Sequence, residues 1–371
     1  MPTNTQASGE ELLRPSNQRC RELMDELVVE KGVSVVICCY NSETRLPETL
    51  RHIACQEVSV HLPWEVIVVD NASTDRTAEV ARLVWRQLGC PTPFRLVNEP
   101  SPGLSNARAS GFAATRYQLM VLCDDDNWLD KGYVQTAYRI MDENPGVGAL
   151  GGYGQAVCEQ QAPAWFDACQ AHYALGRQHS RSGNLTNHKG YVYGAGMVVN
   201  KRAWLEVVGR GYRSWLSDRK GELLSSGGDI ELCYAFRMLG YEIYYHEQLS
   251  FKHFIPASRL QWSYLEGLFS GFVKADVFLE SWRYFVADEF PTERSVRRGC
   301  RLLCWETLAK ITHRKRSIVR FVAFGIQEGR VDALYTKYYF SRLRRLLFQR
   351  RKLIRSLTAT LTFRQKNRTI Q

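Results

Sequence analysis

The run Val33-Ser-Val-Val-Ile-Cys-Cys-Tyr40 is apolar almost without interruption, which is typical of a strand buried on both faces of a parallel sheet. Three further strand-like runs follow at regular intervals, with helical patterns between them. We expect strands at 33–40, 64–70, 94–98 and 117–123, and helices at 43–55, 73–88 and 105–115. This alternation predicts an α/β fold whose sheet is Rossmann-like, doubly wound and mostly parallel.

Polar residues stand where the predicted strands end, at Tyr40-Asn41, Asp70-Asn71, Glu99 and Asp124–Asp126. Because the carboxyl ends of parallel strands meet at one edge of the sheet, we expect these side chains to face a single ligand-binding crevice. Three adjacent carboxylates repel one another unless a cation lies among them, and a hard divalent ion such as Mg²⁺ or Mn²⁺ suits oxygen ligands. A solvated acidic turn that caps a helix is the alternative.

The alternation of strands and helices stops after Gly152. We expect an irregular, aromatic segment at 155–190, helices at 201–208 and 229–239, a strand at 241–246 and mainly helix beyond 262. Asp229 is expected at or near the N-cap of its helix. The chain then divides into an N-terminal extension (1–30), a catalytic domain (31–260, with halves 31–153 and 154–260) and a basic helical C-terminal region (261–371).

Positive charge is concentrated at the C-terminal end. The net charge is +11, but residues 283–371 hold 22 Lys and Arg against 6 Asp and Glu, so the rest of the chain is mildly acidic. In Arg342–Arg355, cations alternate with leucines at helical spacing, which favours a helix on an anionic membrane surface. The alternatives are a basic helix packed on the catalytic domain and, with charge as its only support, nucleic-acid binding.

Three absences in the sequence bear on the compartment. No apolar stretch reaches the roughly 20 residues of a membrane-spanning helix, and the N-terminus has no signal-peptide pattern. The 11 cysteines are scattered without a CxxC pair, so we expect them to be reduced. We therefore expect a cytoplasmic protein that is peripheral on the inner face of the cell membrane.

Residues 33 to about 260 resemble the glycosyltransferases of family 2, which have the GT-A fold of nucleotide-diphospho-sugar transferases. The motifs that carry the resemblance, in the family's order, are Val35–Asn41, Val68–Asp75, Gly103–Arg108, Asp124–Asp126 and Gly228–Leu232. Two positions depart from the family pattern. Cys123 stands where many relatives have the first aspartate of the metal motif, and Gly228 replaces a common glutamate.

The resemblance implies roles for the residues on the donor side. Tyr40 and Asn41 would line the pocket for the base, and Asp70, with Asn71 beside it, would bind the nucleoside. Arg108 would approach the pyrophosphate, unless it is an ordinary arginine of the helix surface. From the residues alone, Asp70 could instead cap the following helix, but Ser73 or Asp75 could serve that role equally well, which favours Asp75 as the structural residue and Asp70 as the ligand contact.

The resemblance also implies the metal and the catalytic base. The aspartate cluster would bind a divalent cation and the nucleotide sugar, with Asp125 and Asp126 preferred as metal ligands over Asp124, which with Asp125 would contact the nucleotide sugar. His253 would be a further ligand, and Arg259 would help to neutralise the diphosphate. Asp229 is our choice for the base that takes the proton of the acceptor hydroxyl, with Glu231 as its alternate.

Together these residues predict an inverting, metal-assisted glycosyltransferase. It would move a sugar from a nucleotide-diphosphate donor, with a UDP-sugar favoured, to a hydroxyl of a glycan or lipid-linked acceptor in cell-surface polysaccharide assembly. The QxxRW signature of processive synthases is missing, which favours the addition of a single sugar. The competing hypotheses are a nucleotidyltransferase, which should carry a glycine-rich phosphate loop that is absent from 33–45, and a non-catalytic adaptor for membranes or nucleic acid with a degenerate transferase domain.

Overall fold

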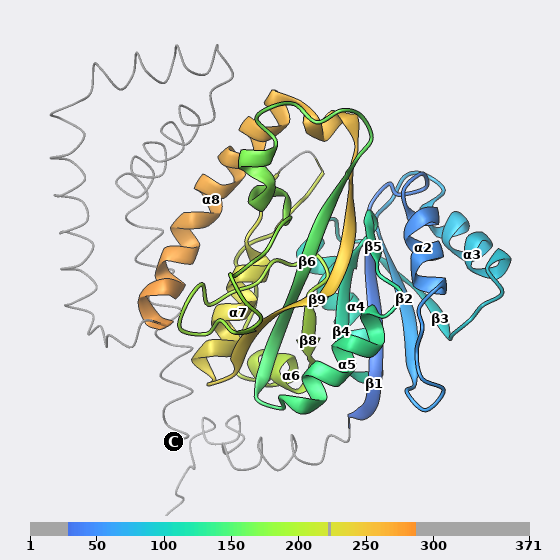
Figure 1. Ribbon diagram of the computed structural model, residues 1–371, viewed down its shortest axis with the longest axis horizontal. Coiled ribbons are helices and arrows are strands. Elements are labelled where there is room, and N and C mark those ends of the chain that lie inside the picture. The colour runs from blue at the N-terminus through green and yellow to red at the C-terminus, as the bar shows by residue number, and fades with distance from the viewer. Residues whose placement is uncertain (1–28, 222–223, 287–371) are drawn as a thin grey trace, which may run out of the picture.

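The computed structural model describes residues 29–221 and 224–286 (Figure 1). The N-terminal extension and the basic C-terminal segment that we predicted to be helical lie outside the described residues, apart from their inner ends. Within the described part, no helix is long and apolar enough to cross a membrane. The cysteines in this part, eight in number, are all free, as expected for reduced thiols.

The first half of the described chain follows the predicted alternation. Its strands are β1 (Glu30–Cys39), β2 (Trp64–Asn71), β3 (Phe94–Glu99) and β4 (Tyr117–Asp124), and its helices are α2 (Leu46–Ala54), α3 (Thr77–Gln87) and α4 (Leu104–Ala114). These strands pair in the order β3-β2-β1-β4, and all three pairings are parallel. The predicted α/β class and the predicted common edge of the strand ends are therefore confirmed.

The second half extends the same sheet as β8-β6-β9-β5. Its elements are β5 (Asn127–Leu129), α5 (Tyr133–Glu143), β6 (Val147–Cys158), the 3₁₀ turn η2 (Asp167–Tyr173), β7 (Gly183–Asn184), β8 (Val198–Asn200), α6 (Lys201–Gly209), α7 (Gly228–Met238), β9 (Glu242–Ile255), the 3₁₀ turn η3 (Ala257–Leu260) and α8 (Trp262–Val286). Here β8 is antiparallel to both neighbours, whereas β6 and β9 are parallel to each other. The sheet is mixed.

One expectation for the second half was wrong in detail. The predicted strand at 241–246 is part of a longer, 14-residue strand, β9, whose residues 242–245 and 250–255 pair with β6 on either side of an irregularity in the register. Asp229 lies near the N-cap of α7, as expected; the N-cap itself is Gly227, with a φ of 114°. Asp229 lies within the first turn of the helix, so its carboxylate is free for contacts away from the helix end.

The sheet is buried on both faces, which explains the uninterrupted apolar run of β1. Odd-numbered residues of β1, such as Val35 and Ile37, pack with α2, α3 and α5, while Val36 packs on the other face with α4, α6 and α7. Helix α8 (orange in Figure 1) lies along α7 on the outside of the second half. The layers leave the carboxyl ends of β1, β2 and β4 at one edge.

Helix α4 approaches the sheet closely because Gly111 has no side chain. A Cβ atom at this position would lie 2.5 Å from Val36 Cγ1 and 3.0 Å from Val69 Cγ2, closer than van der Waals contact allows. Both valines are fully buried, so they have little room to move. This close approach sets where α4 begins at the edge of the sheet.

We predict that Gly111→Ala destabilises the fold by about 1–3 kcal/mol through overpacking, although alanine is the better helix former. The matched control is Gly132→Ala, whose added Cβ would meet nothing closer than Thr136 Oγ1 at 3.8 Å. Urea unfolding of both variants measures the difference. A Gly111→Ala protein as stable as the control would contradict the close packing of α4.

Candidate functional site

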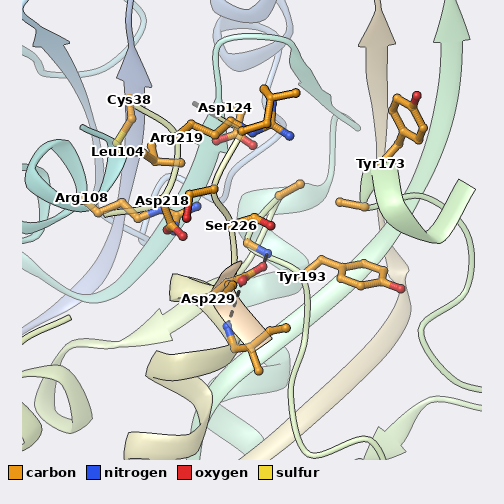
Figure 2. A pocket seen from close by; sticks show the side chains of 18 of the residues that line it. Cys38, Leu104, Arg108, Asp124, Tyr173, Tyr193, Asp218, Arg219, Ser226 and Asp229 are labelled. Atoms are coloured by element: carbon orange, nitrogen blue, oxygen red, sulfur yellow. Dashed lines mark hydrogen bonds and ion pairs between the residues drawn. The ribbon is translucent and has the colours of Figure 1, made fainter. Parts of the chain in front are cut away.

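A cavity of about 640 Å³ opens where the strand ends meet the starts of α4 and α7 and one side of α8. Figure 2 shows Arg108, Asp218 and Asp229 grouped together, with Asp124 above them and Tyr173 and Tyr193 on the other side. Nine of the residues that we singled out from the sequence line this cavity: Tyr40, Asn71, Arg108, Asp124, Asp125, Asp126, Asp229, His253 and Arg259.

Two side chains of the turn before α2 hold the carboxylate of Asp125. Ser42 Oγ donates a hydrogen bond to its carboxylate, and Arg45 Nη2 lies 2.6 Å from Oδ2. Burial and the charge of Asp126 raise the pKa of Asp125, against the effect of Arg45. Among the described residues, no group of three or more His, Cys, Asp or Glu side chains could hold a metal, so the expected trio of Asp125, Asp126 and His253 does not assemble.

Asp126 and His253 do lie together. His253 Nε2 is 3.3 Å from Asp126 Oδ1, and Arg259 Nη1 is 2.7 Å from Asp126 Oδ2. Burial alone would raise the pKa of Asp126, but Arg259 and His253 hold it well below its ordinary value. The carboxylate therefore stays ionised although it is only 2% exposed.

The orientation of the His253 ring decides what this pair can bind. Nδ1 lies 2.9 Å from the carbonyl oxygen of Tyr173, which only accepts hydrogen bonds, so Nδ1 carries a proton. Nε2 then faces Asp126 and needs either a second proton or a cation between the two side chains. A ring nitrogen fixed by a carbonyl in this way is the usual arrangement of a metal-ligating histidine, and Mg²⁺ or Mn²⁺ commonly completes its shell with phosphate oxygens and water. The Asp126–His253 pair fits a divalent cation.

Asp229 faces the cavity from the first turn of α7. Its Oδ2 accepts a hydrogen bond of 2.7 Å from the Gly194 backbone N–H, and its Oδ1 lies 2.9 Å from the N–H of Ile230. Within the described part of the chain, Asp124 and Asp229 are the cavity carboxylates that have no Arg, Lys or His within ion-pair distance. They are available to substrates.

Arg108 forms an ion pair that the sequence did not reveal. Its Nη1 lies 2.6 Å from Oδ2 of Asp218, a residue on the segment before α7 whose φ is 52°. Asp218 Oδ1 also accepts a hydrogen bond of 2.8 Å from the Gly228 N–H. Burial raises the pKa of Asp218, and Arg108 opposes this shift. Nothing in the sequence around Asp218 indicated this role, because its partner lies 110 residues away.

Glu231 lies outside the cavity, which corrects its assignment as the alternate base. It is fully buried and accepts hydrogen bonds from Ser214 Oγ at 2.8 Å, the Trp215 N–H at 3.0 Å and Trp282 Nε1 at 3.2 Å. Burial raises its pKa to about 7. Glu231 therefore fixes the segment before α7 and the helix α8 to one another.

The residues that we expected to contact the base and the ribose mainly form hydrogen bonds with the surrounding loops. Asn41 Oδ1 accepts a hydrogen bond from the Thr74 N–H at 2.8 Å, and neither Asn41 nor Asp70 lines the cavity. Asn71 lines it, but its amide donates to the Ser101 carbonyl at 2.7 Å and accepts from Gly103 at 2.8 Å. Asn71 thus shapes the turn that leads into α4.

Two aromatic residues, Tyr191 and Tyr193, also line the cavity. The Nζ atom of Lys189 lies 3.6 Å from the centre of the Tyr193 ring, and burial lowers the pKa of Lys189 to about 8. Three partly buried tryptophans lie outside the cavity and make ring contacts with other residues. Trp165 and Trp262 contact each other edge to face, and Trp128 stacks between His52 and Phe254.

Comparison with known proteins identifies a family. Residues 34–209 match the sequence profile described as Glycosyl transferase family 2. Among curated proteins, the undecaprenyl-phosphate 4-deoxy-4-formamido-L-arabinose transferase of Pseudomonas paraeruginosa is 35% identical over 94 residues. That alignment covers 25% of this chain and 27% of the relative, so the chain matches only about a quarter of that protein's length.

Two solved structures share the fold. S. aureus TarS 1-349 in complex with UDP-GlcNAc has a TM-score of 0.50 and 16% identity, over 91% of this chain and 90% of that one. The mannosyltransferase PcManGT of Pyrobaculum calidifontis, in complex with GDP-Man and Mn²⁺, has a TM-score of 0.52 and 16% identity, over 87% and 88%. At these identities the likeness supports the GT-A fold and nothing more specific.

We predict that Glu231→Gln lowers the free energy of unfolding by about 1–3 kcal/mol, because the amide N–H₂ of glutamine would face backbone or indole donors. Asp229→Asn, two positions earlier, should change stability far less, since Asp229 is partly exposed in the cavity. Chemical denaturation of the two variants measures both values. Equal stability losses would contradict the distinction between a structural and a substrate-facing carboxylate.

Proposed function

Through residues 34–209 the chain belongs to glycosyl transferase family 2, and we propose that it transfers a sugar from a nucleoside-diphosphate donor, with a UDP-sugar favoured, to an acceptor hydroxyl. The reaction would invert the anomeric carbon. The observation that carries the proposal is the content of one cavity: a carboxylate–histidine pair suited to a divalent cation, and an aspartate without a cationic partner at the start of α7.

The donor would lie along the strand ends, with its base near Tyr40 and its diphosphate toward Asp126 and His253. Asp126 and His253 would hold a Mg²⁺ or Mn²⁺ ion, which neutralises the negative charge that develops on the leaving diphosphate. Asp124, without a cationic partner, would contact the nucleotide sugar. Arg45 and Arg259 hold the neighbouring carboxylates of Asp125 and Asp126 in place through ion pairs.

Asp229 would act as the base. The acceptor oxygen forms a bond to the anomeric carbon while the bond from that carbon to the diphosphate oxygen breaks, and the hydroxyl proton passes to the carboxylate of Asp229. The Gly194 N–H fixes one oxygen of this carboxylate at 2.7 Å, so its orientation is set before substrates bind. A preset orientation lowers the entropy cost of reaching the reactive geometry.

The acceptor would be a glycan or a lipid-linked hydroxyl. The P. paraeruginosa relative is named an undecaprenyl-phosphate transferase, which is consistent with a lipid-linked acceptor for this chain as well. The basic segment 340–371, which we propose to contact an anionic membrane surface, lies outside the described residues.

We predict that UDP-sugars raise the melting temperature of the protein more in the presence of Mn²⁺ than in its absence, because a ligand that binds the folded state stabilises it. Asp126→Asn should remove the Mn²⁺-dependent part of the shift and leave the metal-free part. A thermal-shift screen of nucleotide sugars measures both. The control is Asp142→Asn, at an exposed aspartate outside the cavity. If Asp126→Asn kept the full Mn²⁺ effect, the metal site would lie elsewhere.

We predict that Asp229→Asn binds the donor as the wild type does but turns it over at least about 100-fold more slowly, as expected for the loss of a general base. Release of the nucleoside diphosphate from the best-binding nucleotide sugar measures turnover, and calorimetry measures binding. Asp167→Asn, at an exposed aspartate outside the cavity, is the matched control. Wild-type turnover in Asp229→Asn would exclude this residue as the base.

A further inference from the structure

The cations that line the cavity are mostly neutralised by carboxylates of the same cavity. Each of these arginines lies within 2.8 Å of an aspartate oxygen, in the pairs Arg45–Asp125, Arg108–Asp218, Arg259–Asp126 and Arg283–Asp276. Arg108 has further negative neighbours, since Asp229 and Asp124 also contribute to raising its pKa. An incoming phosphate at Arg108 would therefore meet several negative charges as well as one positive charge.

Arg219 is the exception. It lines the cavity and is half-buried, and across residues 29–221 and 224–286 it is the cavity arginine with no carboxylate within ion-pair distance. Its Nη1 instead donates to the hydroxyl of Tyr264, on α8, at 3.3 Å. A guanidinium with five N–H donors and one neutral acceptor has most of its hydrogen-bonding capacity left for a ligand.

The helix end that usually binds phosphate in α/β proteins is closed here. At the start of α4 the Leu104 N–H donates to the Arg219 carbonyl at 3.0 Å, and the Ser105 N–H donates to the Ser217 carbonyl at 3.5 Å. The Asn106 and Ala107 N–H groups both donate to the Gly103 carbonyl. No N–H of this first turn is left for an anion, although helix N-termini are common phosphate sites. The segment that closes the helix end is the one that carries Arg219.

The backbone at Arg219 is fixed from both sides. Its carbonyl is held by Leu104, and the preceding residue, Asp218, is only 3% exposed and is tied to Arg108 and Gly228. The φ of 52° at Asp218 is uncommon for a residue other than glycine and persists only where the surroundings determine it. These contacts therefore fix the position of Arg219 at the cavity wall.

From these observations we propose that Arg219 binds a phosphate group of the reacting substrates, either on the donor diphosphate or on a phosphorylated acceptor. An arginine matches phosphate oxygens with two parallel N–H donors, which makes the contact both strong and directional. This inference rests on the proposed glycosyl transfer, and it reassigns the phosphate contact from Arg108 to Arg219. Before a substrate binds, the Tyr264 hydroxyl accepts a hydrogen bond from the guanidinium, and the Leu104 N–H holds the backbone carbonyl of Arg219.

The test compares Arg219→Gln and Arg219→Lys with Arg213→Gln, which removes an exposed arginine of the same segment outside the cavity. Calorimetry with Mn²⁺ measures the affinity of each protein for UDP, UMP and uridine. If Arg219 takes the donor diphosphate, Arg219→Gln should weaken UDP binding by roughly 10-fold or more, the effect of losing a charge-assisted hydrogen bond. Uridine binding should not change, and Arg219→Lys should fall between the two.

A second arm identifies an acceptor phosphate. Octyl phosphate and octanol are titrated into each protein saturated with UDP. Unchanged UDP affinity with loss of octyl phosphate binding in Arg219→Gln alone assigns Arg219 to the acceptor. Unchanged binding of both UDP and octyl phosphate, or an equal loss of uridine binding, overturns the inference. If the wild type itself binds no nucleotide, the proposed function fails first, so the two failures are distinguishable.

Discussion

The burial of carboxylates at the end of β4 is the constraint on which the rest of the site depends. Asp125 and Asp126 are 8% and 2% exposed, and each would be costly as an ion without a partner. Arg45 neutralises the first, and Arg259, with His253, compensates the second. These partners come from the turn before α2 and from the consecutive elements β9 and η3, so the charges at one strand end connect it to two distant parts of the chain.

Buried charges are also paired elsewhere in the cavity. Arg108 and Asp218 form a second buried pair, which joins α4 to the segment before α7. Such a pair contributes little net stability by itself, but the loss of one partner would leave an uncompensated buried charge. Most charged side chains of the cavity are therefore paired. Within the described residues, those without an opposite charge at ion-pair distance are Asp124, Asp229 and Arg219. Those are the side chains best placed to meet a substrate.

The two departures from the family pattern acquire physical explanations in the structure. Cys123 is 1% exposed and points into the core shared by β1 and β4, so its strand position is an apolar one. At Gly228, a Cβ atom would collide with the carboxylate of Asp218. Asp218 thus occupies the space next to Asp229 that a side chain at position 228 would need. Position 228 lacks the glutamate that is common in the family, but the fold places the carboxylate of Asp218 at the same point.

Local sequence patterns were sufficient to predict the parallel half of the sheet and the edge at which the site lies. Periodicity and strand-end chemistry are local properties, so β1 to β4 and the positions of Asp126 and Asp229 could be predicted from neighbouring residues. Which charges neutralise one another follows only from the tertiary contacts. These contacts separate Asp125 from the Asp126–His253 pair, bury Glu231 outside the cavity and leave Arg219 available, because each outcome depends on partners that folding brings together from distant segments.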